Sequence, residues 1–225
     1  SAAFFPGKST LVMIVLYFGG MLVAVIMGLL LKGRAFKGNP VPFVMELPVY
    51  RFPSLKSVLL HMWDKAKDFL QRAFTIIFMA SVVIWFLRSF DVRFNLVSDS
   101  SESILAALGS LISVIFKPLG FDDWRAATAL ITGFSAKETV ISTLSVLLNA
   151  GDSVEAALPS VFTTLEASSF LAFVLLYMPC VATMAATRRE WGSMKGALMA
   201  GGFQTLTAYI VALIVYQGGL LLGFV

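Results

Sequence analysis

The stretch Phe170-Leu-Ala-Phe-Val-Leu-Leu-Tyr-Met-Pro-Cys-Val-Ala-Thr-Met-Ala-Ala186 is apolar throughout and carries a Pro-Cys pair near its middle. Proline lacks the backbone N–H and crowds the carbonyl one turn earlier, so Pro179 is expected to free polar backbone near Leu175. Freed backbone beside Cys180, the only thiol of the chain, is how a cation site is assembled inside lipid. On these residues alone, a packed cysteine beside a proline kink is the commoner arrangement.

The composition places the whole chain in a membrane. Hydrophobic residues make up 58% of its 225 residues, charged residues make up 13%, and the mean hydropathy is +0.87. A soluble domain of this length cannot bury so much apolar surface. The net charge of +4 does not indicate a nucleic-acid partner, because the basic residues lie at the ends of apolar segments. We predict an all-α, polytopic transmembrane helical bundle in a lipid bilayer, with broken or re-entrant helices, forming one domain over residues 1–225.

The first part of the chain divides into a span, an irregular segment and an amphipathic helix. Residues 10–31 have the length of a membrane-spanning helix. Four prolines forbid a continuous helix after it, so residues 40–72 are predicted to be a proline-rich irregular segment followed by a cytoplasmic, interfacial amphipathic helix. That helix either ends near Arg72 or continues directly into a second span over residues 73–87.

The middle of the chain begins with a short apolar run. Residues 104–116 are too short for a full span and are expected to form a re-entrant segment or a short broken helix. Asp122 and Asp123 are expected to cap a long helix that runs from Arg125 to Leu148. This helix carries charged residues near its middle, and charges at that depth rarely face lipid.

Two further spans are predicted at residues 170–186 and 196–215, separated by a basic turn. The positive-inside rule assigns this turn, residues 188–195, and the basic segment at residues 32–72 to the cytoplasm. The acidic loops then face outward.

A polar stripe runs along the helix predicted from Arg125 to Leu148. Its members are Ser135, Glu138, Ser142 and Ser145, at spacings of three, four and three residues. Such spacing puts hydroxyls and a carboxylate on one helical face, as in a water-filled path or a bundle interior. The alternative is that Glu138 pairs with Lys137, or with a basic residue elsewhere, and only holds helices together. We favour the path, because an ionisable group inside a membrane is by default a functional one.

Side chains that suit a transition metal lie near these features. Thr183 and Met184 follow Cys180 on the same helical face, and a thiolate, a thioether, a carboxylate and freed carbonyls suit a borderline first-row cation. Glu46 lies between prolines and is a further candidate, with pairing to Arg51 as the alternative. The predicted metal ligands are Cys180, Glu138 and Glu46, and the predicted pathway lining is Ser135, Ser142, Ser145, Thr183, Met184 and Pro179.

Three motifs in this sequence resemble the FeoB family of bacterial ferrous iron transporters. They are Pro42-Phe-Val-Met-Glu-Leu-Pro-Val-Tyr-Arg51, Gly133-Phe-Ser-Ala-Lys-Glu138, and Tyr177-Met-Pro-Cys-Val-Ala-Thr183 followed by Arg188-Arg189-Glu190. The resemblance covers essentially the whole chain, in order. It is to the second of the two gate halves in the membrane domain of that family.

The resemblance implies uptake of ferrous iron across the bacterial inner membrane, with Fe²⁺ as the transported substrate and no bound cofactor. It also implies that Cys180 is a gate cysteine, and that Glu46 and Glu138 hold the acidic gate positions. The implied partners are a GTPase domain that holds GTP and Mg²⁺, a first gate half, and small cytoplasmic FeoA or FeoC proteins; a homo-oligomer stays open. No enzymatic activity is expected of this chain, because the GTPase domain and the first gate cysteine lie outside it.

Two other classes of function stay open. The gate fold is shared with nucleoside-recognition or nucleoside-transport modules, in which the polar stripe and aromatic residues would hold a neutral organic solute. A membrane enzyme with Cys180 as nucleophile and His61 as base is disfavoured. His61 is predicted at the cytoplasmic surface and Cys180 in the membrane interior, so the two side chains cannot meet.

Overall fold

The computed structural model describes residues 3–34, 54–97, 99–148, 150, 154–178 and 180–223. The α-helices within them are α1 (Ser9–Arg34), α2 (Leu55–Ser89), α3 (Ile104–Phe116), α4 (Trp124–Gly133), α5 (Thr139–Leu147), α6 (Val154–Ala157), α7 (Thr164–Leu176), α8 (Val181–Trp191) and α9 (Met194–Leu221). Across these described ranges the one β feature is an isolated bridge between Phe90 and Leu96. The predicted all-α class is confirmed.

Several of these helices are membrane spans by length and composition. Within the described ranges, Ser9–Lys32, Thr164–Trp191 and Met194–Leu221 are long and apolar enough to cross a bilayer. A further pair, Ile104–Leu119 with Trp124–Gly133, bends by 104° at its break and is either a broken span or a re-entrant loop. The first helix of this pair contains the short apolar run at residues 104–116. The two predictions for that run, a re-entrant segment and a short broken helix, therefore both remain. The chain is a multi-pass membrane protein.

The helix α2 is continuous over 35 residues, so the amphipathic helix does continue through residues 73–87, and a second span there stays a prediction. The side chain of Ser54 caps it by accepting the N–H of Ser57 at 3.3 Å. Its apolar part, Phe78–Ser89, is shorter than a full span. The irregular segment predicted before this helix, with Glu46, lies outside the described residues.

The long helix predicted from Arg125 to Leu148 is wrong. Asp123 does cap its start, accepting the N–H of Arg125 at 2.7 Å, but α4 ends at Gly133 and α5 begins only at Thr139. A Cβ at Gly133 would collide with the side chains of Val140 and Tyr177, so the close return of the chain requires glycine there. Glycine also weakens a helix by about 1 kcal/mol relative to alanine.

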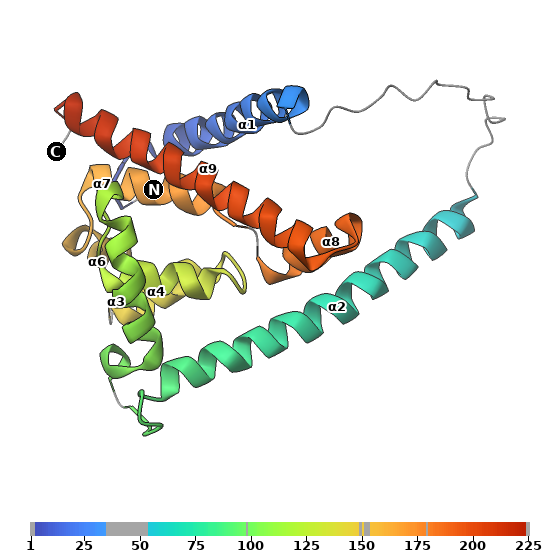
Figure 1. The fold of residues 1–225 in the computed structure, drawn as a ribbon, viewed down its shortest axis with the longest axis horizontal. Helices are drawn as coiled ribbons and strands as arrows, with labels where there is room; N and C mark the ends of the chain where they lie inside the picture. The colour runs from blue at the N-terminus through green and yellow to red at the C-terminus, as the bar shows by residue number, and fades with distance from the viewer. Residues whose placement is uncertain are drawn as a thin grey trace.

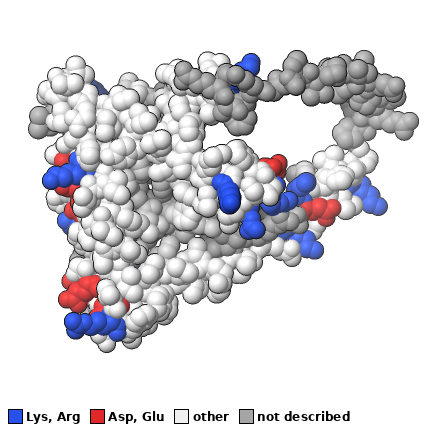
Figure 2. All heavy atoms as spheres, in the orientation of Figure 1, with Lys and Arg blue, Asp and Glu red and all other residues white. Residues whose placement is uncertain are grey.

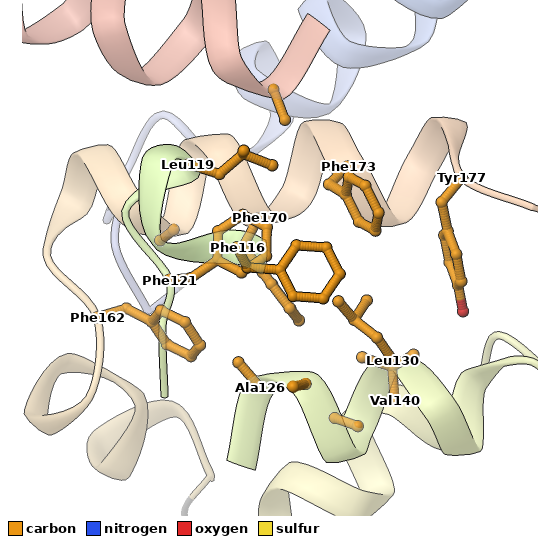
Figure 3. Close-up of a cluster of buried hydrophobic side chains, with 14 of the residues drawn as sticks. Phe116, Leu119, Phe121, Ala126, Leu130, Val140, Phe162, Phe170, Phe173 and Tyr177 are labelled. Atoms are coloured by element: carbon orange, nitrogen blue, oxygen red, sulfur yellow. The ribbon is translucent and has the colours of Figure 1, made fainter. Parts of the chain in front are cut away.

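The hydrophobic core lies among α3, α4, α5, α7 and α9, and α7 packs most extensively against α9 (Figure 3). Phe121 and Phe173 are almost completely buried, with ring centroids 5.9 Å apart. The ring of Tyr177 stacks on that of Phe173 at 5.5 Å and ends this row of aromatic side chains. The hydroxyl of Ser169 donates to the carbonyl of Ala212 at 3.1 Å and ties α7 to α9. This packing fixes the carboxyl end of α7, where the candidate site lies.

The arrangement of the helices separates the charged parts of the chain. In Figure 1, α2 runs along one side of the molecule and α1 and α9 along the other, with α4 and α7 between them. The amino end of α2 and the turn between α8 and α9 lie toward one end of the long axis, and the loop after α2 lies toward the other. Figure 2 shows that charged side chains gather in separate groups and leave broad uncharged surface between them.

Candidate functional site

Two interruptions of helices lie against each other in the molecule. Residues 134–138 separate α4 from α5, and residues 177–180 separate α7 from α8. The backbone N–H of Val181 donates to the carbonyl oxygen of Phe134 at 2.9 Å, which joins the two breaks directly. Irregular backbone at membrane depth is tolerated where it is buried in protein or lines a cavity. The junction of the two breaks is therefore the candidate functional site.

Lys137 binds the carboxyl end of α7. Its ammonium donates to the carbonyl oxygens of Val174, Leu175 and Tyr177, each at 3.2 Å, and lies 4.7 Å from the centroid of the Tyr177 ring. The sequence predicts freed carbonyls near Leu175, but it gives Lys137 no role except as a partner of Glu138. No local pattern could have revealed these contacts, because the carbonyls lie 37 to 40 residues further along the chain.

Cys180 lies at the N-cap of α8 and is half-buried. Its sulfur is 3.4 Å from the hydroxyl oxygen of Thr183, so these two side chains lie together on one face. The next residue, Val181, donates its backbone N–H to Phe134, in the break that also carries Lys137 and Glu138. The fold thus brings two of the three predicted metal ligands, Cys180 and Glu138, into one region. That they bind a metal stays a prediction.

Glu138 is the last residue before α5, and its side chain is exposed. Among the described residues the one ion pair joins Arg125 to Asp123, so Glu138 has no salt bridge there. Lys137 is engaged with the end of α7, so the predicted pair of Lys137 with Glu138 is not formed, and a basic partner outside the described residues stays a prediction. The carboxylate remains available to a cation.

Hydroxyl groups line a cavity of about 310 Å³ between α2, the start of α3, α4 and α5. The α4 and α5 side of its wall contains Thr128, Thr132, Ser135, Thr139, Ser142 and Thr143. Ser135 donates its hydroxyl to the carbonyl of Thr132 and Thr139 donates to that of Ala136, both at 2.7 Å. Because these protons point into backbone carbonyls, the oxygen lone pairs are left as acceptors. Apolar atoms make up most of the cavity surface, and these oxygens are the acceptors that it offers to water or to a hydrated cation.

Part of this wall is among the residues predicted from the sequence, and the rest is not. Ser135 and Ser142 belong to the predicted stripe and line the cavity, whereas Glu138 and Ser145 do not line it. Thr128, Thr132 and Thr139 were not predicted, although they show the same pattern, a hydroxyl every three or four residues. The continuous series is Thr128, Thr132, Ser135, Thr139 and Ser142, at spacings of four, three, four and three residues.

The other predicted residues lie elsewhere. The sulfur of Met184 packs against α9, 3.1 Å from the position that a Cβ on Gly201 would occupy. Glu46 and Pro179 lie outside the described residues. Within the described ranges no group of three or more His, Cys, Asp or Glu side chains could hold a metal. A cation at the junction would therefore need hydroxyl or carbonyl oxygens beside the thiol and the carboxylate.

Two family models match this chain. Residues 70–194 match the Gate family, described as nucleoside recognition. Residues 13–65 match the family described as ferrous iron transport protein B C terminus. The boundary between the two matches falls inside α2.

The chain is also similar to curated proteins. The Fe(2+) transporter FeoB of Staphylococcus aureus (strain COL) is 37% identical over 217 residues, which are 96% of this chain and 32% of that protein. A fusion of Fe(2+) transport protein A with Fe(2+) transporter FeoB from Porphyromonas gingivalis is 35% identical over 271 residues, covering 98% of this chain and 32% of the fusion. The Escherichia coli (strain K12) Fe(2+) transporter FeoB is 31% identical over 276 residues, covering 96% and 35%. The chain thus spans about a third of the length of these relatives. No solved structure matches it.

Proposed function

We propose that this chain, which belongs to the FeoB family of ferrous iron transport proteins, forms part of the path by which Fe²⁺ crosses the bacterial inner membrane. The observation that carries the proposal is the junction of two broken helices at Cys180 and Glu138. In transporters, ions bind where helices are interrupted inside the membrane, because helix ends and unwound backbone supply partial charges there.

The hydroxyl-lined cavity supplies an approach to this junction. Its wall includes Ser100 and Ser103 beside the loop after α2, and it continues to Ser135 in the break between α4 and α5. A hydrated cation entering from the loop would meet acceptor oxygens along this wall. The cation would keep most of its water shell up to the break.

At the junction the ion would exchange part of its water for protein ligands. A thiolate from Cys180 and a carboxylate from Glu138 suit Fe²⁺ better than Mg²⁺ or Ca²⁺, which prefer oxygen alone. The thiol must lose its proton to bind, so binding would release a proton. Thr183 Oγ1 would stand beside the ion, and Glu46 stays a predicted third ligand.

We infer that transport requires the rest of the parent protein. The family resemblance points to an amino-terminal GTPase domain that binds GTP and Mg²⁺ and to a first gate half, and we assign the catalytic activity to that domain. The Porphyromonas gingivalis relative carries a transport protein A in the same chain. That fusion supports a FeoA-type protein as a partner.

The test is anaerobic Fe²⁺ uptake by the parent transporter in proteoliposomes that contain a fluorescent iron chelator. Cys180→Ser and Glu138→Gln should each lower the initial rate by about tenfold or more, as loss of a metal ligand does. Glu190→Gln removes an exposed carboxylate from α8 and should leave the rate unchanged. Wild-type rates in both site variants would contradict the proposal.

A module for a neutral organic solute is the second candidate, and the cavity favours it. Its volume of about 310 Å³ lies in the range of small-molecule sites. Trp85 offers an aromatic face and Arg88 offers donors in the same wall. Calorimetric titration of the parent protein with nucleosides and with Fe²⁺ or Mn²⁺ separates the two candidates. Binding of the metal without binding of a nucleoside supports the ion path, and the reverse supports the solute module.

A further inference from the structure

The carboxyl end of α7 has carbonyl groups that the chain beyond it cannot satisfy. In a continuous helix the oxygen of Leu175 would accept from residue 179, but that residue is a proline and has no N–H. The oxygen of Tyr177 would accept from Val181, whose N–H goes to Phe134 instead, at 2.9 Å. Two acceptors at the end of α7 are thus deprived of their helical donors.

The ammonium of Lys137 takes both acceptors, together with the oxygen of Val174. An ammonium has three N–H donors, so three carbonyl oxygens at 3.2 Å satisfy it completely. The Tyr177 ring also contacts this ammonium, with its centroid 4.7 Å from the Lys137 nitrogen. Among the described residues no carboxylate forms an ion pair with Lys137. Its charge is balanced by the negative end of α7.

Three neutral oxygens and an aromatic face around a single positive charge have the composition of a monovalent-cation site. Helix carboxyl ends and unwound carbonyls bind such ions in membrane transporters. We propose that the end of α7 is a monovalent-cation site whose cation, the Lys137 ammonium, is supplied by the chain itself. This site is separate in chemistry from the thiol and carboxylate of Cys180 and Glu138. It does not depend on Fe²⁺ being the transported ion.

The proposal predicts that removing the tethered charge opens the site to a free ion. Lys137→Ala in the full-length parent transporter should unfold at a lower temperature in choline chloride than the wild type does. Potassium or ammonium chloride at the same concentration should raise the midpoint of this variant by about 3 °C at saturation, because an ion that binds the folded state stabilises it. The wild-type midpoint should be the same in all three salts. Unfolding is measured as the loss of the helical circular dichroism signal with rising temperature.

Two control variants locate the effect. Lys137→Met fills the space of the lysine stem without a charge, so it should be destabilised yet insensitive to the choice of cation. Lys195→Ala removes an exposed lysine from α9 and should behave as the wild type. A response of Lys137→Ala no larger than that of Lys195→Ala, or an equal response of Lys137→Met, would overturn the proposal. If Lys137→Ala does not fold in choline, the yield of folded protein in each salt becomes the readout. Recovery in potassium or ammonium supports the site, and equal loss in all three salts overturns it.

Discussion

The backbone N–H of Val181 lies 2.9 Å from the carbonyl oxygen of Phe134, so the two helix breaks share a hydrogen bond between main-chain atoms. This bond fixes the start of α8, and with it Cys180, relative to the break that carries Glu138. Lys137, in the same break as Glu138, holds the carboxyl end of α7 through three further hydrogen bonds. Any movement that separates the breaks must disrupt all four bonds together.

Cys180 should be accessible to water and protected by Fe²⁺. In the parent transporter with its other cysteines replaced, a membrane-impermeant thiol reagent should label Cys180, and Fe²⁺ under anaerobic conditions should slow the labelling. Its half-buried position beside Thr183 permits access by a small reagent. Mass spectrometry gives the labelled fraction. A cysteine that stays unlabelled with and without Fe²⁺ would be a packed structural residue, and the ion site would then rest on Glu138.

Gly133→Ala should weaken the junction. The added Cβ would meet the side chain of Val140 and would come within 2.5 Å of the Tyr177 hydroxyl, so one of the breaks must shift. We expect a loss of about 1–3 kcal/mol in the free energy of unfolding, as for other overpacked cores. The control is Gly202→Ala on α9, where a Cβ meets nothing within 4 Å and stability should not fall. Equal unfolding midpoints for the two variants would contradict this account.

Removing the hydroxyl of Tyr177 should cost little. This oxygen is buried and has no hydrogen-bond partner among the described residues, so Tyr177→Phe deletes an unsatisfied polar group and keeps the ring under Lys137. We expect unchanged or slightly higher stability. Tyr209→Phe is the matched comparison, because that hydroxyl donates to the carbonyl of Ile115 at 2.9 Å. Its loss should cost about 0.5–1.5 kcal/mol. The difference between the two midpoints is the measurement, and the opposite order would refute the assignment.

Ser142→Trp should block the cavity. Ser142 lines the hydroxyl wall, and an indole ring there would fill a large part of its 310 Å³. Initial Fe²⁺ uptake by the parent transporter should fall by about tenfold or more, in line with loss of a binding route. Ile141→Trp places the same ring on a neighbouring exposed position, outside the cavity, and should leave uptake unchanged. Equal rates for the two variants would remove the cavity from the path.

The loop after α2 should lose order in acid. Asp91 accepts the backbone N–H of Asn95 at 2.8 Å and that of Arg93 at 2.7 Å, and these bonds, the one from Asn95 foremost, lower the pKa of its carboxyl below the ordinary value. A lowered folded-state pKa contributes stability that is complete above the unfolded pKa of about 3.9 and is lost as the pH falls through the folded value.

We therefore expect the amides of Arg93 and Asn95 to lose protection against hydrogen exchange below about pH 4. The loop lies outside the spans, so exchange can be followed by mass spectrometry of the parent protein in detergent. Asp91→Asn lacks the titrating group and should show weaker protection without this pH dependence. Protection in the wild type that does not change between pH 6 and pH 3 would contradict the assignment.

The sequence predicted the break in which a proline stands and missed the break in which none does. Pro179 removes a donor, so an interruption near Leu175 follows from covalent chemistry alone. The break after Gly133 depends on partners from α7 and α8, which supply the Val181 N–H and the carbonyls for Lys137. The spacing of residues along one segment contains no information about those distant partners. Because the hydroxyl residues recur every three or four positions, the sequence predicted a continuous helix.

The sequence likewise predicted some residues of the candidate site and not others. Cys180 was predicted from the Pro-Cys pair, and Glu138 was predicted from a polar stripe that puts a carboxylate at membrane depth. The role of Lys137 could not be identified, because a lysine beside a glutamate in sequence is equally consistent with an ion pair. The hydroxyl residues from Thr128 to Ser142 recur at helical spacing in the sequence. Only Ser135 and Ser142 of this series were predicted to line a path. The placement of Glu46 lies beyond the described residues, and its part in the site stays a prediction.

The unbroken course of α2 has a mechanical consequence. Its 35 residues extend over about 52 Å, and it contacts the rest of the molecule through α3 and α8 while Ser81 and Trp85 form part of the cavity wall. A rigid rod of that length that pivots by about 10° near one end moves its other end by roughly 9 Å. A rotation of α2 that widened the cavity slightly would therefore be coupled to a much larger displacement at Leu55.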